Sequence, residues 1–167
     1  LRPGVLTTRM PRRCAACMSM LTGPPRDTAT NLRFGRRSII AAESGAVLAY
    51  GELQRSCRRI GGLLARAGVA PGDAVSVVMP NGLQTARVLL GAMYAGCCVN
   101  PVNLLSQPEQ MQYVLEHSDC KLVFCAPEWV ERVRALLARI ERPVRLIVVD
   151  PDGAAIEGER EADGAAP

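Results

Sequence analysis

Residues 69–103 read VAPGDAVSVVMPNGLQTARVLLGAMYAGCCVNPVN, and this stretch decides the fold. The apolar run over 74–79 predicts a strand that is covered on both faces. Turn residues at 80–82 end the strand, and 83–95 predict a helix that is apolar nearly all round and therefore buried. After Gly96, residues 97–99 predict a second buried strand. This order favours a right-handed crossover between parallel strands.

The sequence on both sides continues the alternation of strands and helices. Upstream, the patterns predict a hairpin over 38–42 and 47–50 and a helix with an apolar stripe from Leu53 to Ala67. Within that helix, Gly61-Gly62 indicates close packing against a neighbouring element.

Downstream, Ser106 and Glu109 are spaced as a capping box, which predicts the start of another helix. The remaining patterns predict a strand over 121–125, a helix over 127–141 and a buried strand over 144–149. The whole order predicts an α/β fold with a mostly parallel sheet and helices on both faces.

Charge is concentrated at the two ends of the chain. The net charge is +4, yet residues 1–37 hold eight arginines and one acid, and 150–167 hold six acids and one arginine. We interpret 1–36 as a basic disordered extension, 37–149 as an incomplete α/β subdomain and 150–167 as an acidic disordered tail or linker. A basic end is compatible with nucleic acid or anionic lipid. Proteins that bind single-stranded nucleic acid place aromatic residues among their basic ones. This basic end lacks that pattern, so we expect no nucleic-acid partner.

The seven cysteines are best interpreted as buried thiols in a reducing cytosol, which predicts a cytoplasmic protein. Cys14 and Cys17 have C-x-x-C spacing, but a zinc site needs a second pair or histidines. A redox motif would need a strand before it and a helix after it. We therefore predict no metal-binding residues, and the role of this pair stays open. No apolar run approaches the ~20 residues of a membrane helix, so we expect no transmembrane segment.

Seven short segments, taken together, resemble the opening of AMP-forming acyl-CoA synthetases, the acyl-adenylate-forming ligases. They are AYGEL (49–53), LLARAGV (63–69), PGDAV (71–75), MPN (79–81), LGAMYAG (90–96), VNPVN (99–103) and LEHSDCKLVF (115–124). The similarity covers about 37–149, and its specificity comes from the order and spacing of the segments. The VNPVN segment is more similar to fatty-acyl or aryl CoA ligases than to peptide-synthetase domains.

The resemblance implies an ATP-dependent reaction in two steps, as in fatty acid metabolism. A carboxylic acid attacks the α-phosphate of ATP to form an acyl-adenylate and pyrophosphate, and the thiol of CoA then displaces AMP. ATP, Mg and CoA are thus implied for the full-length family member. The family's phosphate-binding Ser/Thr/Gly-rich loop, aromatic-Gly-x-Thr-Glu segment, ribose-binding Asp and catalytic Lys are not in this sequence. We therefore predict no catalytic and no cofactor-binding residues, and a chain that is inactive alone because the remainder of the ligase is missing.

Three features superficially resemble functional motifs. Gly91 and Gly96 have the spacing of a phosphate-binding loop, but they lie in an apolar helical pattern and no Lys-Ser/Thr follows. Lys121 begins a predicted strand, and His117 lies at a predicted helix end, where a cation suits the helix dipole. We predict a structural position for each.

Three hypotheses remain open. The first is a fragment of an acid–CoA ligase. The second is a self-contained nucleotide-binding module, which would need a Gly-rich turn directly after a strand; Met79-Pro80-Asn81-Gly82 does not fit that pattern. The third is a catalytically dead interaction module derived from such a ligase, which the sequence does not separate from the first.

Overall fold

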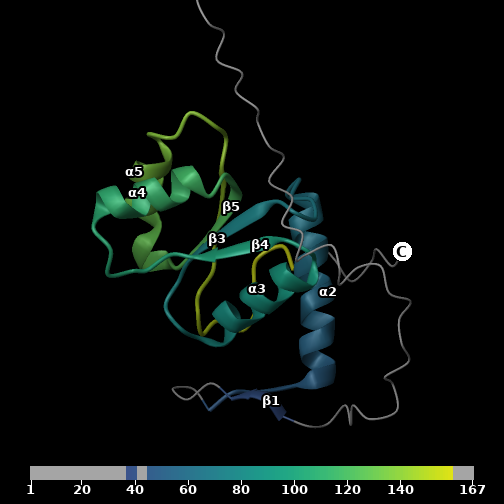
Figure 1. Ribbon diagram of the computed structural model, residues 1–167. Coiled ribbons are helices and arrows are strands. Elements are labelled where there is room, and N and C mark those ends of the chain that lie inside the picture. Colours follow the sequence, from purple (N-terminus) through teal and green to yellow (C-terminus); the bar gives the residue numbers. More distant parts are fainter. Residues whose placement is uncertain (1–36, 41–44, 160–167) are drawn as a thin grey trace, which may run out of the picture.

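The structure, a computed structural model, describes residues 37–40 and 45–159. Its elements follow in the order β1 (Arg37–Ile40), β2 (Val47–Ala49), α2 (Tyr50–Arg66), β3 (Ala74–Val78), α3 (Leu83–Tyr94), β4 (Cys98–Pro101), α4 (Pro108–His117), β5 (Cys120–Cys125), the 3-10 helix η2 (Pro127–Trp129), α5 (Val130–Leu137) and β6 (Arg145–Val148). Figure 1 shows how they are arranged. The alternation predicted from the sequence is confirmed.

Four parallel strands form the central sheet, in the order β4-β3-β5-β6. Strand β3 lies between β4 and β5, with Val75 in register with Val99 on one side and Leu122 on the other. Strands β1 and β2 form a separate antiparallel hairpin that leads into α2. The parallel sheet and the predicted hairpin are therefore both confirmed.

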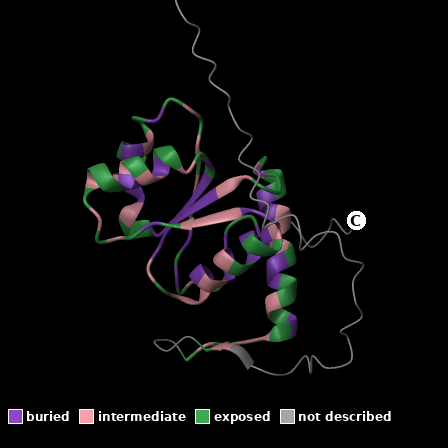
Figure 2. Cartoon of the chain, in the orientation of Figure 1, coloured by how far each residue is buried: buried purple, intermediate pink, exposed green. Residues whose placement is uncertain are grey.

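Helices cover both faces of the sheet, as predicted. Alternate residues of a strand point to opposite faces, and β5 divides its side chains in this way. Leu122 and Phe124 pack with residues of α2 and α3, whereas Val123 and Cys125 pack with α4 and α5. The central strands are accordingly buried almost throughout (Figure 2).

Helix α3 differs from its prediction, because it is not buried all round. One side packs against α2 and the sheet, but Leu90, Met93 and Tyr94 are exposed. Its one charged residue, Arg87, is buried. Periodicity alone did not reveal this orientation, since apolar residues occur on every side of the helix.

The cap of helix α4 lies one residue later than the cap predicted at Ser106. Gln107 is the capping residue, and its backbone N–H donates to the Oε1 of Gln110 at 3.2 Å. The reason is Pro108, which favours an extended conformation in the residue before it. Gln107 has that conformation, so the helix begins at Pro108.

Candidate functional site

A polar cluster lies between α2, α3 and the segment that follows β6. Its members are Ser56, Arg59, Gln84, Arg87 and Glu159, of which all but Arg59 are almost completely buried. Helix α2 supplies two of them, α3 supplies two, and residue 159 completes the group. Charged side chains seldom occupy the interior unless they are paired, so each charge here needs a partner.

Arg87 is at the centre of the cluster and uses each nitrogen of its guanidinium. Nε donates to the Oγ of Ser56 at 2.6 Å, and Nη1 donates to the Oε1 of Gln84 at 2.6 Å. Nη2 donates to Oε1 of Glu159. Burial lowers the pKa of Arg87 below its ordinary value, and the charge of Glu159 opposes that shift. The arginine is thus held as the paired cation of a buried network.

Glu159 is shared between two arginines. The Nε of Arg59 lies 2.9 Å from the same Oε1 that Arg87 contacts, and the backbone N–H of Ile156 donates to Oε2 at 3.3 Å. Both carboxylate oxygens are therefore engaged. Such an arrangement fixes the position of a segment, and two guanidinium groups stabilise the charged form of the carboxylate, which disfavours a role as a general base.

Several residues between Pro151 and Glu159 contact α2 and α3. Gln84 donates from its backbone N–H to the Pro151 carbonyl at 2.9 Å and from Nε2 to the Gly153 carbonyl at 2.5 Å. Ile156 is buried in the core. The sequence suggested an acidic disordered tail or linker from residue 150, but residues 150–159 are ordered, because Glu159 and Ile156 find partners distant in sequence. Residues 160–167 and 1–36 lie outside the described part.

A cavity of about 500 Å³ adjoins this cluster. It is lined by Leu48, Glu52, Arg55, Ser56, Arg59, Leu83, Gln84, Arg87, Ala154, Ala155 and Glu159. Glu52 already accepts the backbone N–H of Ala49 at 3.1 Å and so stabilises the start of α2. The lining offers guanidinium groups, carboxylates and the hydroxyl of Ser56, which accepts a hydrogen bond from Arg87. It contains no thiol, imidazole or amine that would serve as a nucleophile or activate that hydroxyl.

The described cysteines lie mainly in the core. Burial raises the pKa of Cys57, and the nearby charge of Arg87 only partly offsets this. Burial, with a smaller contribution from Glu128, raises the pKa of Cys125 to about 11. Both thiols are protonated near neutral pH and are poor nucleophiles. Cys14 and Cys17 fall outside the described residues.

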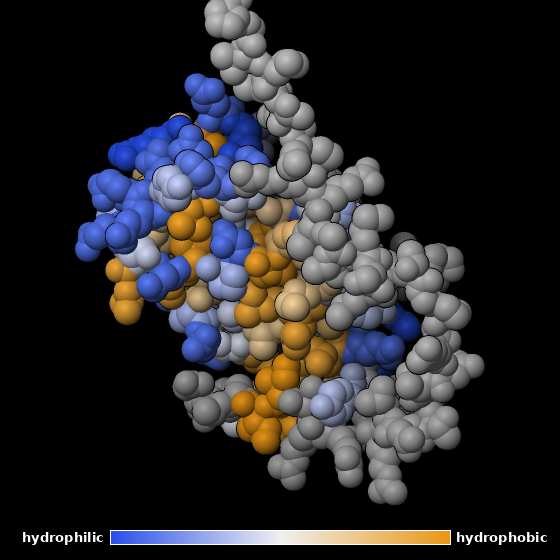
Figure 3. Space-filling view, in the orientation of Figure 1, coloured by the Kyte–Doolittle hydropathy of each residue, from blue (hydrophilic) through white to orange (hydrophobic). Residues whose placement is uncertain are grey.

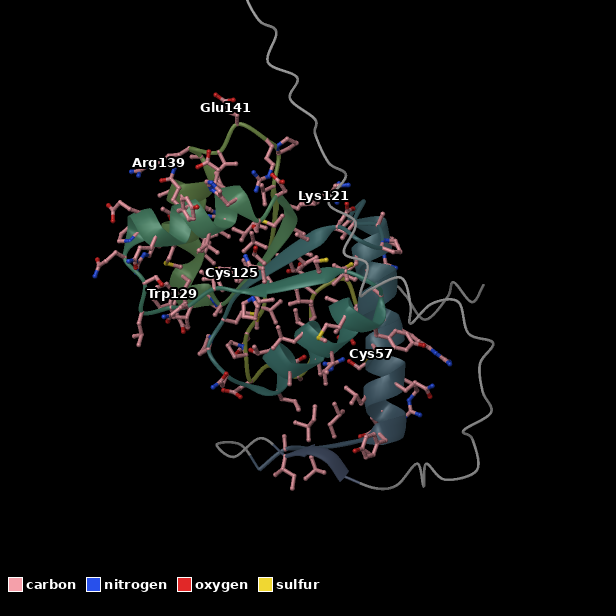
Figure 4. All side chains as sticks on the ribbon, viewed as in Figure 1. Cys57, Lys121, Cys125, Trp129, Arg139 and Glu141 are labelled. Carbon is pink, nitrogen blue, oxygen red and sulfur yellow. The ribbon has the colours of Figure 1, made fainter. Side chains whose placement is uncertain are left out.

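The three features that resemble functional motifs lie in different elements of the fold. Gly91 lies inside α3 against Ile60. Lys121 forms an ion pair with Asp73 at 2.8 Å. His117 ends α4, where its ring stacks on Tyr113 with centroids 3.8 Å apart and its Nδ1 lies 3.2 Å from the Tyr113 carbonyl. Figure 4 shows Lys121 and Cys57 on separate parts of the molecule.

Within residues 37–40 and 45–159, no group of three or more His, Cys, Asp or Glu side chains is placed to hold a metal ion. None of the described helices is long and apolar enough to cross a membrane.

Sequence reasoning missed the Arg87–Glu159 cluster altogether. A signal was present, because Arg87 is the one charged residue in an otherwise uncharged helix. Its partner could not be identified, since Glu159 lies in a stretch without periodicity, 72 positions away.

Residues 26–167 match the family described as "AMP-binding enzyme". A sulfoacetate–CoA ligase from Cupriavidus necator is 43% identical over 114 residues, which are 68% of this chain and 22% of that ligase. The uncharacterized protein Rv1549 of Mycobacterium tuberculosis is 36% identical over 87 residues, 52% of this chain and 50% of that protein.

A similar fold is present in a benzoate CoA ligase from Burkholderia xenovorans LB400, with a TM-score of 0.67 and 30% identity. The match covers 83% of this chain and 27% of that one. The chain thus spans about a quarter of the length of the ligases to which it is similar.

Proposed function

This chain belongs to the AMP-binding enzyme family, and from that we propose that it forms the first part of the fold of an ATP-dependent carboxylic acid–CoA ligase. The observation that carries the proposal is the family match over residues 26–167. The fold it shares with a benzoate CoA ligase supports the same assignment. The reaction of the complete enzyme would join a carboxylic acid to CoA through an acyl-adenylate.

The described residues do not fit ATP and Mg²⁺. Phosphate groups need free cations or converging backbone donors, and Mg²⁺ needs carboxylate oxygens. Lys121 is paired with Asp73, and two of the three arginines in the cavity lining, Arg59 and Arg87, are paired with Glu159. Arg55 is the one cation of that lining outside these ion pairs, and a single guanidinium is a poor match for a triphosphate. No metal-ligating cluster occurs among the same residues. We therefore propose that ATP, Mg²⁺ and CoA bind to other parts of a complete ligase, and that the 167-residue chain alone forms no adenylate.

The substrate is proposed only as a carboxylic acid, without a narrower class. The similar proteins named for their substrates are a sulfoacetate–CoA ligase and a benzoate CoA ligase. These two acids differ in size and charge, so the shared fold does not by itself select between them.

Two measurements test the proposal. The purified chain should show no carboxylate-dependent ATP–pyrophosphate exchange with benzoate, sulfoacetate or a fatty acid; exchange above the carboxylate-free control would overturn its inactivity. In a chimera, residues 26–167 replace the matching part of the B. xenovorans benzoate CoA ligase. The chimera should retain benzoate-dependent exchange, and a folded chimera without exchange would count against the ligase assignment.

The second candidate is a catalytically dead interaction module derived from such a ligase. The observation that favours it is Rv1549, because the 87 matched residues make up half of that protein, so a protein similar to this chain can be much shorter than a complete ligase. The DNA downstream of the coding sequence distinguishes the two. An in-frame or frameshifted Ser/Thr/Gly-rich loop there favours the ligase, whereas an unrelated gene favours the module.

A further inference from the structure

Helix α2 contributes two neighbouring arginines to the cavity beside the Arg87 cluster. Arg55 and Arg59 both line the cavity, and they are four positions apart on the helix, so their side chains lie on one face of it. Two like charges at this spacing repel each other. An anion placed between the two guanidinium groups would relieve that repulsion.

Both arginines have hydrogen-bond donors that the described residues do not use. Arg59 donates to Glu159 through Nε, and its side chain is still 28% exposed. Within residues 37–40 and 45–159, its Nη1 and Nη2 have no hydrogen-bond partner, and the exposed Arg55 has neither an ion pair nor a hydrogen bond from its side chain. The N–H groups of a guanidinium match the two oxygens of a carboxylate, so this pair of side chains is suited to bind one.

The charge of the cavity lining favours a ligand with a single negative charge. The lining holds three guanidinium groups, from Arg55, Arg59 and Arg87, and two carboxylates, from Glu52 and Glu159. One positive charge is therefore in excess. A monoanion balances that excess, whereas a ligand with several negative charges would bring charges that find no partner in the lining.

Much of the remaining lining is apolar and comes from other elements. It consists of Leu48 on β2, Leu83 at the start of α3, and Ala154 and Ala155 after β6. Figure 3 shows a hydrophilic patch over the middle of α2 beside a hydrophobic band that runs from α3 to the hairpin, so polar and apolar surface meet along this helix. The volume of about 500 Å³ is typical of pockets for small organic molecules. An organic ligand would cover the apolar lining, and an inorganic anion would leave it in contact with water.

We propose that this cavity is a binding site for a small organic monocarboxylate. The carboxylate lies between Arg55 and Arg59, and the apolar part of the ligand packs against the leucines and alanines of the lining. The inference goes beyond the proposed function, because it concerns binding by this chain without adenylate formation. Every residue of the lining belongs to the described part, so the site can be tested on the 167-residue chain.

Calorimetric titration of the chain with benzoate tests the proposal. We expect saturable binding at one site, no binding of the uncharged analogue benzamide, and weaker binding of inorganic phosphate than of benzoate. Arg55→Gln should weaken benzoate binding about tenfold or more, because it removes a charged hydrogen-bond donor. Arg58→Gln removes the same charge from an exposed position of α2 outside the cavity, so it is the matched control and should leave the affinity unchanged.

A second variant tests the charge of the lining independently. Ala155 is exposed, so Ala155→Asp should leave the melting temperature unchanged, but its carboxylate cancels the excess positive charge and should abolish benzoate binding. Gln54→Glu, which adds the same charge at an exposed position of α2 outside the cavity, should not.

Four results would overturn the inference. They are an absence of saturable benzoate binding to the unmodified chain, equal losses in Arg55→Gln and Arg58→Gln, undiminished binding in both Arg55→Gln and Ala155→Asp, and binding of phosphate as tight as that of benzoate. None of them affects the ligase assignment, which depends on exchange by the chimera. Loss of exchange in the chimera would in turn leave binding by the free chain unaffected.

Discussion

Arg87 and Glu159 are 72 positions apart in the sequence and form a buried ion pair that fastens the segment after β6 to α3. Arg59 shares the same carboxylate from α2. The three residues therefore join two helices and the last described segment. Because charged groups are costly to bury, the cluster should make the folded state sensitive to the loss of any one member.

Removing Glu159 alone should strongly destabilise the chain. Glu159→Ala leaves Arg87 buried without its counter-charge, and breaking a buried pair in this way costs about 3–5 kcal/mol. Urea denaturation should show this as a lower midpoint. The control is Glu131→Ala, which breaks the exposed pair with Arg134 and should cost at most about 1 kcal/mol. Equal effects for the two variants would contradict the structure.

Replacing both charges at once should be much less harmful. Arg87→Met with Glu159→Leu removes the desolvation cost together with the attraction, and such replacements are often neutral or stabilising. We expect the double variant to recover most of the free energy of unfolding lost in Glu159→Ala. If the double variant is as unstable as the single one, the cost arises from packing of the segment and not from the unpaired charge.

Two glycines at the contact between α2 and α3 should respond in opposite directions to alanine. A Cβ on Gly91 would lie 2.7 Å from the Cβ of Ile60, which is too close, so Gly91→Ala should destabilise by about 1–2 kcal/mol despite its gain in helix propensity. A Cβ on Gly61 would lie 3.6 Å from that of Ala95, an ordinary contact. Gly61→Ala should therefore stabilise by up to about 1 kcal/mol. The measurement is the melting temperature of each variant. A change in the same direction for both variants would contradict the contact between the two helices.

Alkylation should distinguish the cysteines by position. With a pKa of about 11, the Cys125 thiol is ionised in only about one molecule in 1,000 at pH 8, and it is fully buried. Cys98 is only half-buried and should react first among the described cysteines. Timed iodoacetamide labelling, read by peptide mass spectrometry, should label Cys125 only after denaturant is added. Rapid labelling of Cys125 in the native protein would contradict its burial.

The sequence predicted the fold well because the fold depends on local patterns. The run over 74–79 and the turn after it predicted β3 and its end, and the capping-box spacing of Ser106 and Glu109 predicted the cap of α4 to within one residue. Contacts between distant residues were not predictable in this way. Gly61-Gly62 suggested a close helix contact, but the tight approach is at Gly91, whose partner Ile60 comes from the other helix. Glu159 likewise has no local pattern that points to Arg87.

A last prediction concerns acid stability and the pair formed by Asp73 and Lys121. Burial would raise the pKa of Asp73, but hydrogen bonds from Lys121 and the backbone of Ala70, with the charge of Lys121, outweigh it and hold the pKa below its ordinary value of 3.8. A lowered folded pKa means that the carboxylate stabilises the protein above about pH 4 and that this contribution is lost as the pH falls through the folded value.

Asp73→Asn should therefore reduce the free energy of unfolding at pH 7, and the difference from the unsubstituted chain should disappear on acidification below about pH 4. The pair is partly exposed, so the charge contribution should be at most about 1 kcal/mol and should shrink in 1 M salt. The destabilisation caused by Lys121→Met should also disappear as the pH falls, because this substitution removes the same attraction to the Asp73 carboxylate. A difference that grows as the pH falls would mean that Asp73 is stabilised in its protonated form, contrary to its contacts with Ala70 and Lys121.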